Sequence, residues 1–115
     1  MKRRLDFSHI SVTDDAIIAI MRRKAPMERI QMASNCWRML CLLIHSQHPG
    51  WDEGRVSRSV LRRARSGEFP LWIEDILTYC SQKAGRGRAA RWAEELGFKE
   101  IWETEFVQKR LAAKD

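Results

Sequence analysis

The sequence predicts an all-α protein, a compact bundle of about five to six helices around a central apolar helix at about residues 26–46. Hydrophobic residues make up 44% of the 115 residues, a share typical of a chain with a packed core. The chain has only three prolines, and its apolar residues recur at helical spacing rather than in the alternation of a strand. We expect one domain over residues 1–115, with a sub-boundary only at the glycine-rich joint 84–88.

The first helix is expected from about Asp14 to Arg23, with Thr13 as its N-cap. Acidic residues fall in its first turn and basic residues in its last, as the helix dipole favours. Its apolar side chains are Ile17, Ile18, Ile20 and Met21.

The second and longest helix is expected to begin near Pro26 and to end near Ser46, before the His48-Pro49-Gly50 turn. It carries one apolar stripe and several apolar residues beside that stripe, so we expect it to be buried over most of its circumference. The stripe is Ile30, Ala33, Trp37, Leu40, Cys41 and Ile44, and the residues beside it are Met32, Met39, Leu42 and Leu43.

The third helix is expected to start after Asp52, a good N-cap residue, and to end near Ser66-Gly67. Trp51 precedes it in a turn, where we expect the indole to close the joint between the second and third helices. The positions expected to face inward are Val56, Val60, Leu61 and Ala64.

The rest of the chain predicts a fourth helix that opens at Pro70, includes Leu71 and Trp72, and ends before Ala84. A fifth helix at about residues 88–96 stops at Gly97, and a sixth follows at about 99–113. These last two form the expected C-terminal helical hairpin.

The charge of the chain is unevenly distributed around a net value of +6. Residues 1–66 carry 13 Lys and Arg against 6 Asp and Glu, whereas residues 67–115 carry 8 against 9. Such asymmetry favours an acidic partner, either a protein face or a nucleic acid.

The sharpest functional pattern is a row of arginines on the third expected helix. Their spacing of three, four and three residues places them on one helix face, where guanidinium groups can pair with carboxylates or phosphates. We predict that they bind a partner protein with an acidic face; the alternative is a nucleic-acid-binding protein that also uses the Lys2-Arg3-Arg4 arm. The row is Arg55, Arg58, Arg62 and Arg65.

No other pattern indicates a catalytic or metal-binding site, so we predict no enzyme, no metal site and no cofactor. Cys41, His45 and His48 could share a helix face, but their spacing matches no known zinc pattern and Cys41 belongs to the apolar stripe. No cysteine lies in a motif typical of a nucleophile beside its base. Residues 89–98 have the small residue and glycine of a helix-turn-helix, but the acidic residues after them would repel phosphate.

The sequence predicts a cytoplasmic location and no membrane contact. The longest apolar run, residues 39–44, is far shorter than the roughly 20 residues that cross a bilayer. Acidic residues follow the basic N-terminus where a secretory signal would be apolar. The three cysteines show no disulfide spacing and fit reduced thiols.

Three short motifs occur in order within residues 20–67: Pro26-Met27-Glu28-Arg29, Trp37-Arg38 and His48-Pro49-Gly50-Trp51. This combination resembles a family of short bacterial helical proteins with no established activity. The stretches 73–77, 91–97 and 100–103 are similar to the helical tail of nucleotidyltransferase-like bacterial proteins, without their catalytic sheet. The resemblance implies that this chain is an antitoxin-like partner of a nucleotidyltransferase-like protein.

Within these motifs, the second expected helix carries the charged residues Glu28, Arg29 and Arg38. An isolated buried charge is costly. We therefore expect these side chains to pair with one another or with neighbours in a salt bridge that helps to specify the fold.

Overall fold

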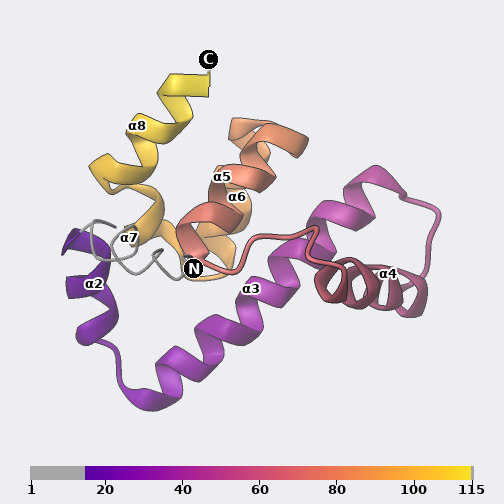
Figure 1. Cartoon of the computed structure of the whole chain (residues 1–115), viewed down its shortest axis with the longest axis horizontal. Coiled ribbons are helices and arrows are strands. Elements are labelled where there is room, and N and C mark those ends of the chain that lie inside the picture. The colour runs from indigo at the N-terminus through magenta and orange to yellow at the C-terminus, as the bar shows by residue number, and fades with distance from the viewer. Residues whose placement is uncertain (1–14, 115) are drawn as a thin grey trace, which may run out of the picture.

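Figure 1 shows the computed structural model, which describes residues 15–114. Thr13, Asp14 and the arm Lys2-Arg3-Arg4 lie outside the described residues. The described part is all-helical, and its seven helices are α2 (Asp15–Arg22), α3 (Pro26–Gln47), α4 (Glu53–Arg65), α5 (Ile73–Ala84), α6 (Arg86–Glu95), α7 (Lys99–Trp102) and α8 (Glu105–Lys114). The predicted helical bundle is confirmed. None of the helices described is long and apolar enough to cross a membrane.

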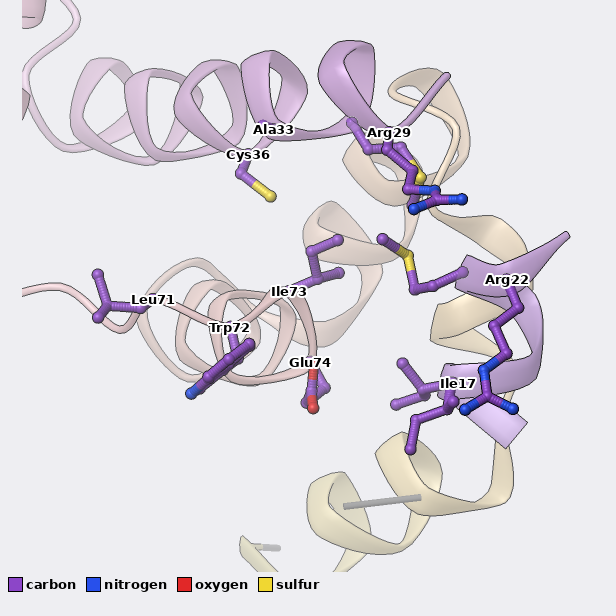
Figure 2. A pocket seen from close by; sticks show the side chains of 12 residues that line it. Ile17, Arg22, Arg29, Ala33, Cys36, Leu71, Trp72, Ile73 and Glu74 are labelled. Atoms are coloured by element: carbon purple, nitrogen blue, oxygen red, sulfur yellow. The ribbon is translucent and has the colours of Figure 1, made fainter. Parts of the chain in front are cut away.

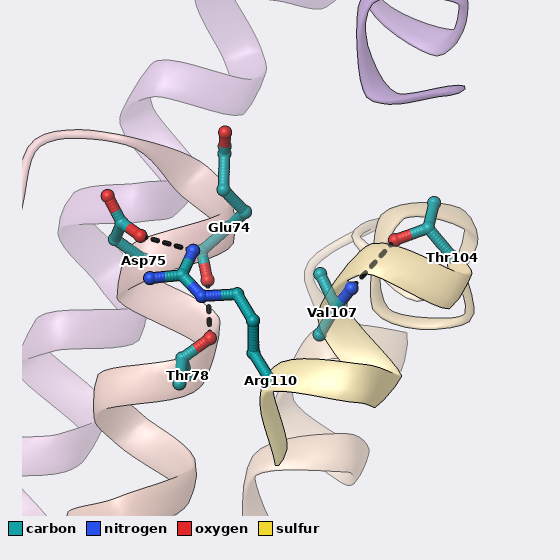
Figure 3. A network of polar contacts seen from close by, with 6 residues as sticks. All are labelled: Glu74, Asp75, Thr78, Thr104, Val107 and Arg110. Atoms are coloured by element: carbon teal, nitrogen blue, oxygen red, sulfur yellow. Dashed lines mark hydrogen bonds and ion pairs between the residues drawn. The ribbon is translucent and has the colours of Figure 1, made fainter. Parts of the chain in front are cut away.

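Helix α5 holds the bundle together, because it packs against α3, α6, α7 and α8. Its Leu77 and Cys80 are fully buried, and α3 contributes Met39 and Leu43 to the same core. At the C-terminal end, Arg110 of α8 forms an ion pair with Asp75 of α5, as Figure 3 shows. This contact joins the last helix to the centre of the fold.

Helix α3 has the predicted bounds within one residue, but only part of it is buried. Ile30 is 63% exposed and Ala33 is also exposed, so the predicted apolar stripe is wrong for the first half of the helix. In the first half only Met32 is buried, whereas in the second half the predicted Leu40 and Ile44 are buried together with Met39 and Leu43. A helix of 22 residues is about 33 Å long, whereas the 12 residues of α5 span about 18 Å, so the start of α3 extends past its neighbour.

The charged residues of α3 do not form the expected salt bridge. Glu28, Arg29 and Arg38 are all exposed. The Glu28 carboxylate accepts a hydrogen bond from the backbone N–H of Ala25 at 2.7 Å, which caps the start of α3. Arg29 Nε donates to the carbonyl of Lys24 at 3.2 Å. Glu28 and Arg29 therefore bond to backbone groups near helix ends rather than to each other.

Two other predicted helices differ from those in the structure. Leu71 and Trp72 lie in a bend before α5 and are 87% and 50% exposed. The fourth helix therefore starts at Ile73, three residues later than predicted. The sixth predicted helix is divided into α7 and α8, because the Thr104 hydroxyl accepts a hydrogen bond from the Val107 N–H at 3.3 Å and starts a new helix (Figure 3).

The position of Leu77 predicts a large loss of stability on truncation. Leu77→Ala should lower the free energy of unfolding by about 2–5 kcal/mol, because it leaves a cavity at the contact of α5 with its neighbours. Leu71→Ala is the matched control, since that side chain is almost fully exposed and should change stability by about 0.5 kcal/mol or less. Urea unfolding of both variants, followed by circular dichroism, measures the difference; equal effects would contradict this packing.

Candidate functional site

Helix α4 lies at one end of the molecule and packs on α3 (Figure 1). Val56 and Val60 are 4% and 0% exposed, and Ser59 is buried between them. Leu61 and Ala64, which we expected to face inward, are exposed. The buried side of α4 is therefore narrow, and most of the helix surface faces solvent.

The start of α4 is fixed by side chains from the preceding turn. The Asp52 carboxylate accepts a hydrogen bond from the Arg55 backbone N–H at 2.8 Å, which confirms the predicted N-cap. The Trp51 ring stacks on His48 with 3.8 Å between ring centroids, and the Arg55 guanidinium lies 4.2 Å from the centroid of the Trp51 ring. Trp51 is partly buried against the core. It closes the joint between α3 and α4, as predicted.

The four arginines of the predicted site all lie on the solvent side of α4. We call this surface the arginine face, and it consists of Arg55, Arg58, Arg62 and Arg65, each exposed. None of the four forms an ion pair with any residue in the described range 15–114. The only acidic residue within α4 is Glu53, in its first turn. The arginine face is therefore a concentration of positive charge that forms no ion pair among the residues described.

An apolar side chain lies within this charged surface. Leu61 is 42% exposed and follows Arg58 by three residues and precedes Arg65 by four, so the three share one side of the helix. Arg63, on the same helix, is only half-exposed. The surface thus combines cations with one apolar contact point.

The residues considered for metal binding are not assembled into a site. No group of three or more His, Cys, Asp or Glu residues within 15–114 could hold a metal ion. The His48 ring stacks on Trp51, and Cys41 is half-buried.

The segment that resembled a helix-turn-helix is also built differently. Its second helix would be α7, which has only four residues and is too short to read a groove. Glu100 within it forms an ion pair with Arg23, the residue that follows α2. This pairing gives the acidic residue a structural role, because it connects α2 to the C-terminal helices.

A small cleft lies between α3 and α6, and the sequence did not predict it. Its volume is about 370 Å³, and its lining includes His45, Arg88, Arg91 and Glu95. These residues come together only through the packing of α6 on α3, so no local motif could have revealed them. The cleft has charges of both signs, unlike the arginine face.

The three thiols are poorly suited to act as nucleophiles near neutral pH. Burial, with a smaller effect of the Glu74 charge, raises the pKa of Cys36 to about 11. Burial raises the pKa of Cys80 to about 12 and also raises that of Cys41. Because their pKa values are raised, the thiols are predominantly protonated at physiological pH. The protonated thiol is a poor nucleophile, since the thiolate is the reactive form.

Comparisons with known proteins found no matching family model, curated protein or solved structure. The function is therefore inferred from the geometry of the chain itself.

The thiol environments predict an order of reactivity toward an aromatic disulfide reagent at pH 8. Cys41 should react first because it is half-exposed, Cys36 more slowly, and the fully buried Cys80 only after unfolding. A thiol with a pKa of about 11 has roughly a hundredth of the thiolate of an ordinary cysteine at this pH. Mass spectrometry of the labelled peptides measures the order. Rapid labelling of Cys80 in the folded protein would contradict its burial.

Proposed function

We propose that this protein is a small helical interaction protein that binds an acidic partner protein through the arginine face of α4. The observation that carries the proposal is the exposure of four arginines on one side of a helix, with no ion pair to any residue described. The N-cap and the buried valines hold this helix in place before a partner arrives. A rigid array loses less entropy on binding than a flexible loop would.

The exposed Leu61 favours a protein partner over a nucleic acid. Arginine and apolar side chains together are typical of the central part of protein interfaces, whereas a phosphate backbone offers no apolar surface to match Leu61. The arginine forks can pair with carboxylates in two parallel hydrogen bonds. An acidic helix or loop that also carries an apolar residue therefore fits the arginine face better than a nucleic acid does.

The resemblance to short bacterial helical proteins makes a nucleotidyltransferase-like protein the first candidate partner. In such a pair, this chain would be the antitoxin-like accessory subunit. The high pKa values of the thiols support a binding role rather than thiol catalysis.

Charge reversal on the arginine face tests the proposal. Arg58→Glu/Arg62→Glu should weaken binding to the captured partner by at least tenfold, or about 1.4 kcal/mol, because it places like charges opposite each other. The matched control is Arg88→Glu/Arg91→Glu, which reverses two exposed arginines on α6 and should leave binding within about twofold. Quantitative mass spectrometry of affinity captures, followed by titration with the purified candidate, measures both.

Titration with a 20-base-pair DNA and a matching RNA examines the alternative. If the four arginines contacted phosphates, raising the salt concentration from 50 to 200 mM would weaken nucleic-acid binding by roughly two orders of magnitude. Our proposal predicts no such nucleic-acid complex. Equal capture of the same partner by the two double variants, or a steep salt-dependent DNA complex lost in Arg58→Glu/Arg62→Glu, would overturn it.

A further inference from the structure

An apolar groove lies apart from the arginine face, since no residue of α4 lines it. It is bounded by α2, the first half of α3 and the segment that leads into α5, and its volume is about 510 Å³ (Figure 2). Small-molecule sites in proteins commonly have volumes of about 300–1,000 Å³ and mainly apolar walls. The apolar walls here include Ile17, Ile18, Met21, Met32 and Ile73.

The two ends of the groove differ in polarity. Figure 2 shows Leu71 and Trp72 at one end and Arg22 and Arg29 at the other. Leu71 is 87% exposed and Trp72 is 50% exposed, so water contacts apolar surface that a ligand could cover. This polarity suits an elongated molecule with one apolar end and one anionic end.

The arginines at the polar end can accept an anion. Arg22 and Arg29 are exposed, and neither forms an ion pair with a residue of the described chain. Arg29 Nε donates to the Lys24 carbonyl at 3.2 Å. The terminal guanidinium nitrogens of Arg29 have no acceptor among the described residues. A carboxylate at this end of the groove would therefore gain charge-assisted hydrogen bonds from an arginine.

The acidic residue of the groove determines which way such a ligand lies. Glu74 is only 7% exposed and already has an interaction partner. Its negative charge is close enough to Cys36 to disfavour the thiolate, so it also repels an anionic group nearby. The head of an anionic ligand is directed away from Glu74, toward Arg22 and Arg29.

We propose that this groove binds a long-chain carboxylate, with its head at the end lined by Arg22 and Arg29 and its alkyl chain along the apolar walls to Trp72. The proposal rests on three features of the groove: its volume, its apolar lining, and the positive charge confined to one end. It does not depend on the function proposed for the arginine face, because α4 does not line the groove.

Laurate, used below its micelle concentration, is the probe for this site. Isothermal titration should show binding of laurate that is at least about tenfold tighter than binding of dodecanol or dodecylammonium, since only laurate pairs with the arginines. Arg22→Gln/Arg29→Gln should weaken laurate binding about tenfold and leave dodecanol unchanged. Arg38→Gln, an exposed arginine of α3 outside the groove, is the control for loss of positive charge.

A second pair of variants tests the location. Ala33→Trp should abolish laurate binding, because Ala33 is an exposed residue of the groove wall and the indole fills the space. Ala64→Trp introduces the same side chain at an exposed position of α4 and should bind laurate like the wild type. Both variants should keep the wild-type circular dichroism spectrum, since neither alanine is buried.

Three results would overturn the proposal: no binding of laurate, equal binding of all three amphiphiles, or binding that Ala33→Trp leaves intact. No binding of laurate would favour an apolar helix of a partner protein as the occupant of the groove. Equal binding of all three amphiphiles would indicate general adsorption to apolar surface. Arg58→Glu/Arg62→Glu should bind laurate normally, so failure at one site is distinguishable from failure at the other.

Discussion

Burial of Val56 and Val60 against α3 determines what α4 presents to solvent. These valines are four residues apart and occupy one side of the helix. Once that side is buried, the helical repeat directs the arginine face outward, where it forms no ion pair with the residues described. The Asp52 cap and the stack of Trp51 on His48 fix where the helix begins and how it leaves the end of α3. The surface is therefore a consequence of packing, not of a flexible loop.

The length of α3 separates the two surfaces of interest. Its C-terminal half packs against α4 and contributes to the core, and its N-terminal half extends past α5 and forms one wall of the groove. The cost of this arrangement is exposed apolar surface at Met27, Ile30 and Leu71. Such surface in a small protein is typical of binding regions.

Local signals predicted much of the fold, and long-range packing accounts for most of the rest. Pro26, Asp52 and Gly97 mark helix boundaries through backbone chemistry that acts within a few residues, so the bounds of α3 and α4 and the outward arginines could be predicted. The exposure of Ile30 could not be predicted, since it depends on the relative lengths of α3 and α5. The Thr104 cap was visible in the sequence but competed with a continuous apolar pattern. The groove joins residues from α2, α3 and the turn before α5, and no single segment indicates it.

The central claim is that a partner protein covers the arginine face, and hydroxyl-radical footprinting of the purified complex tests it most directly. Leu61 and Leu71 provide an internal comparison, because both are exposed leucines and they lie on different surfaces. The account predicts that the partner lowers the oxidation of Leu61 severalfold and leaves that of Leu71 unchanged. Unchanged oxidation of Leu61 in a saturated complex would show that the partner binds elsewhere and would contradict the account.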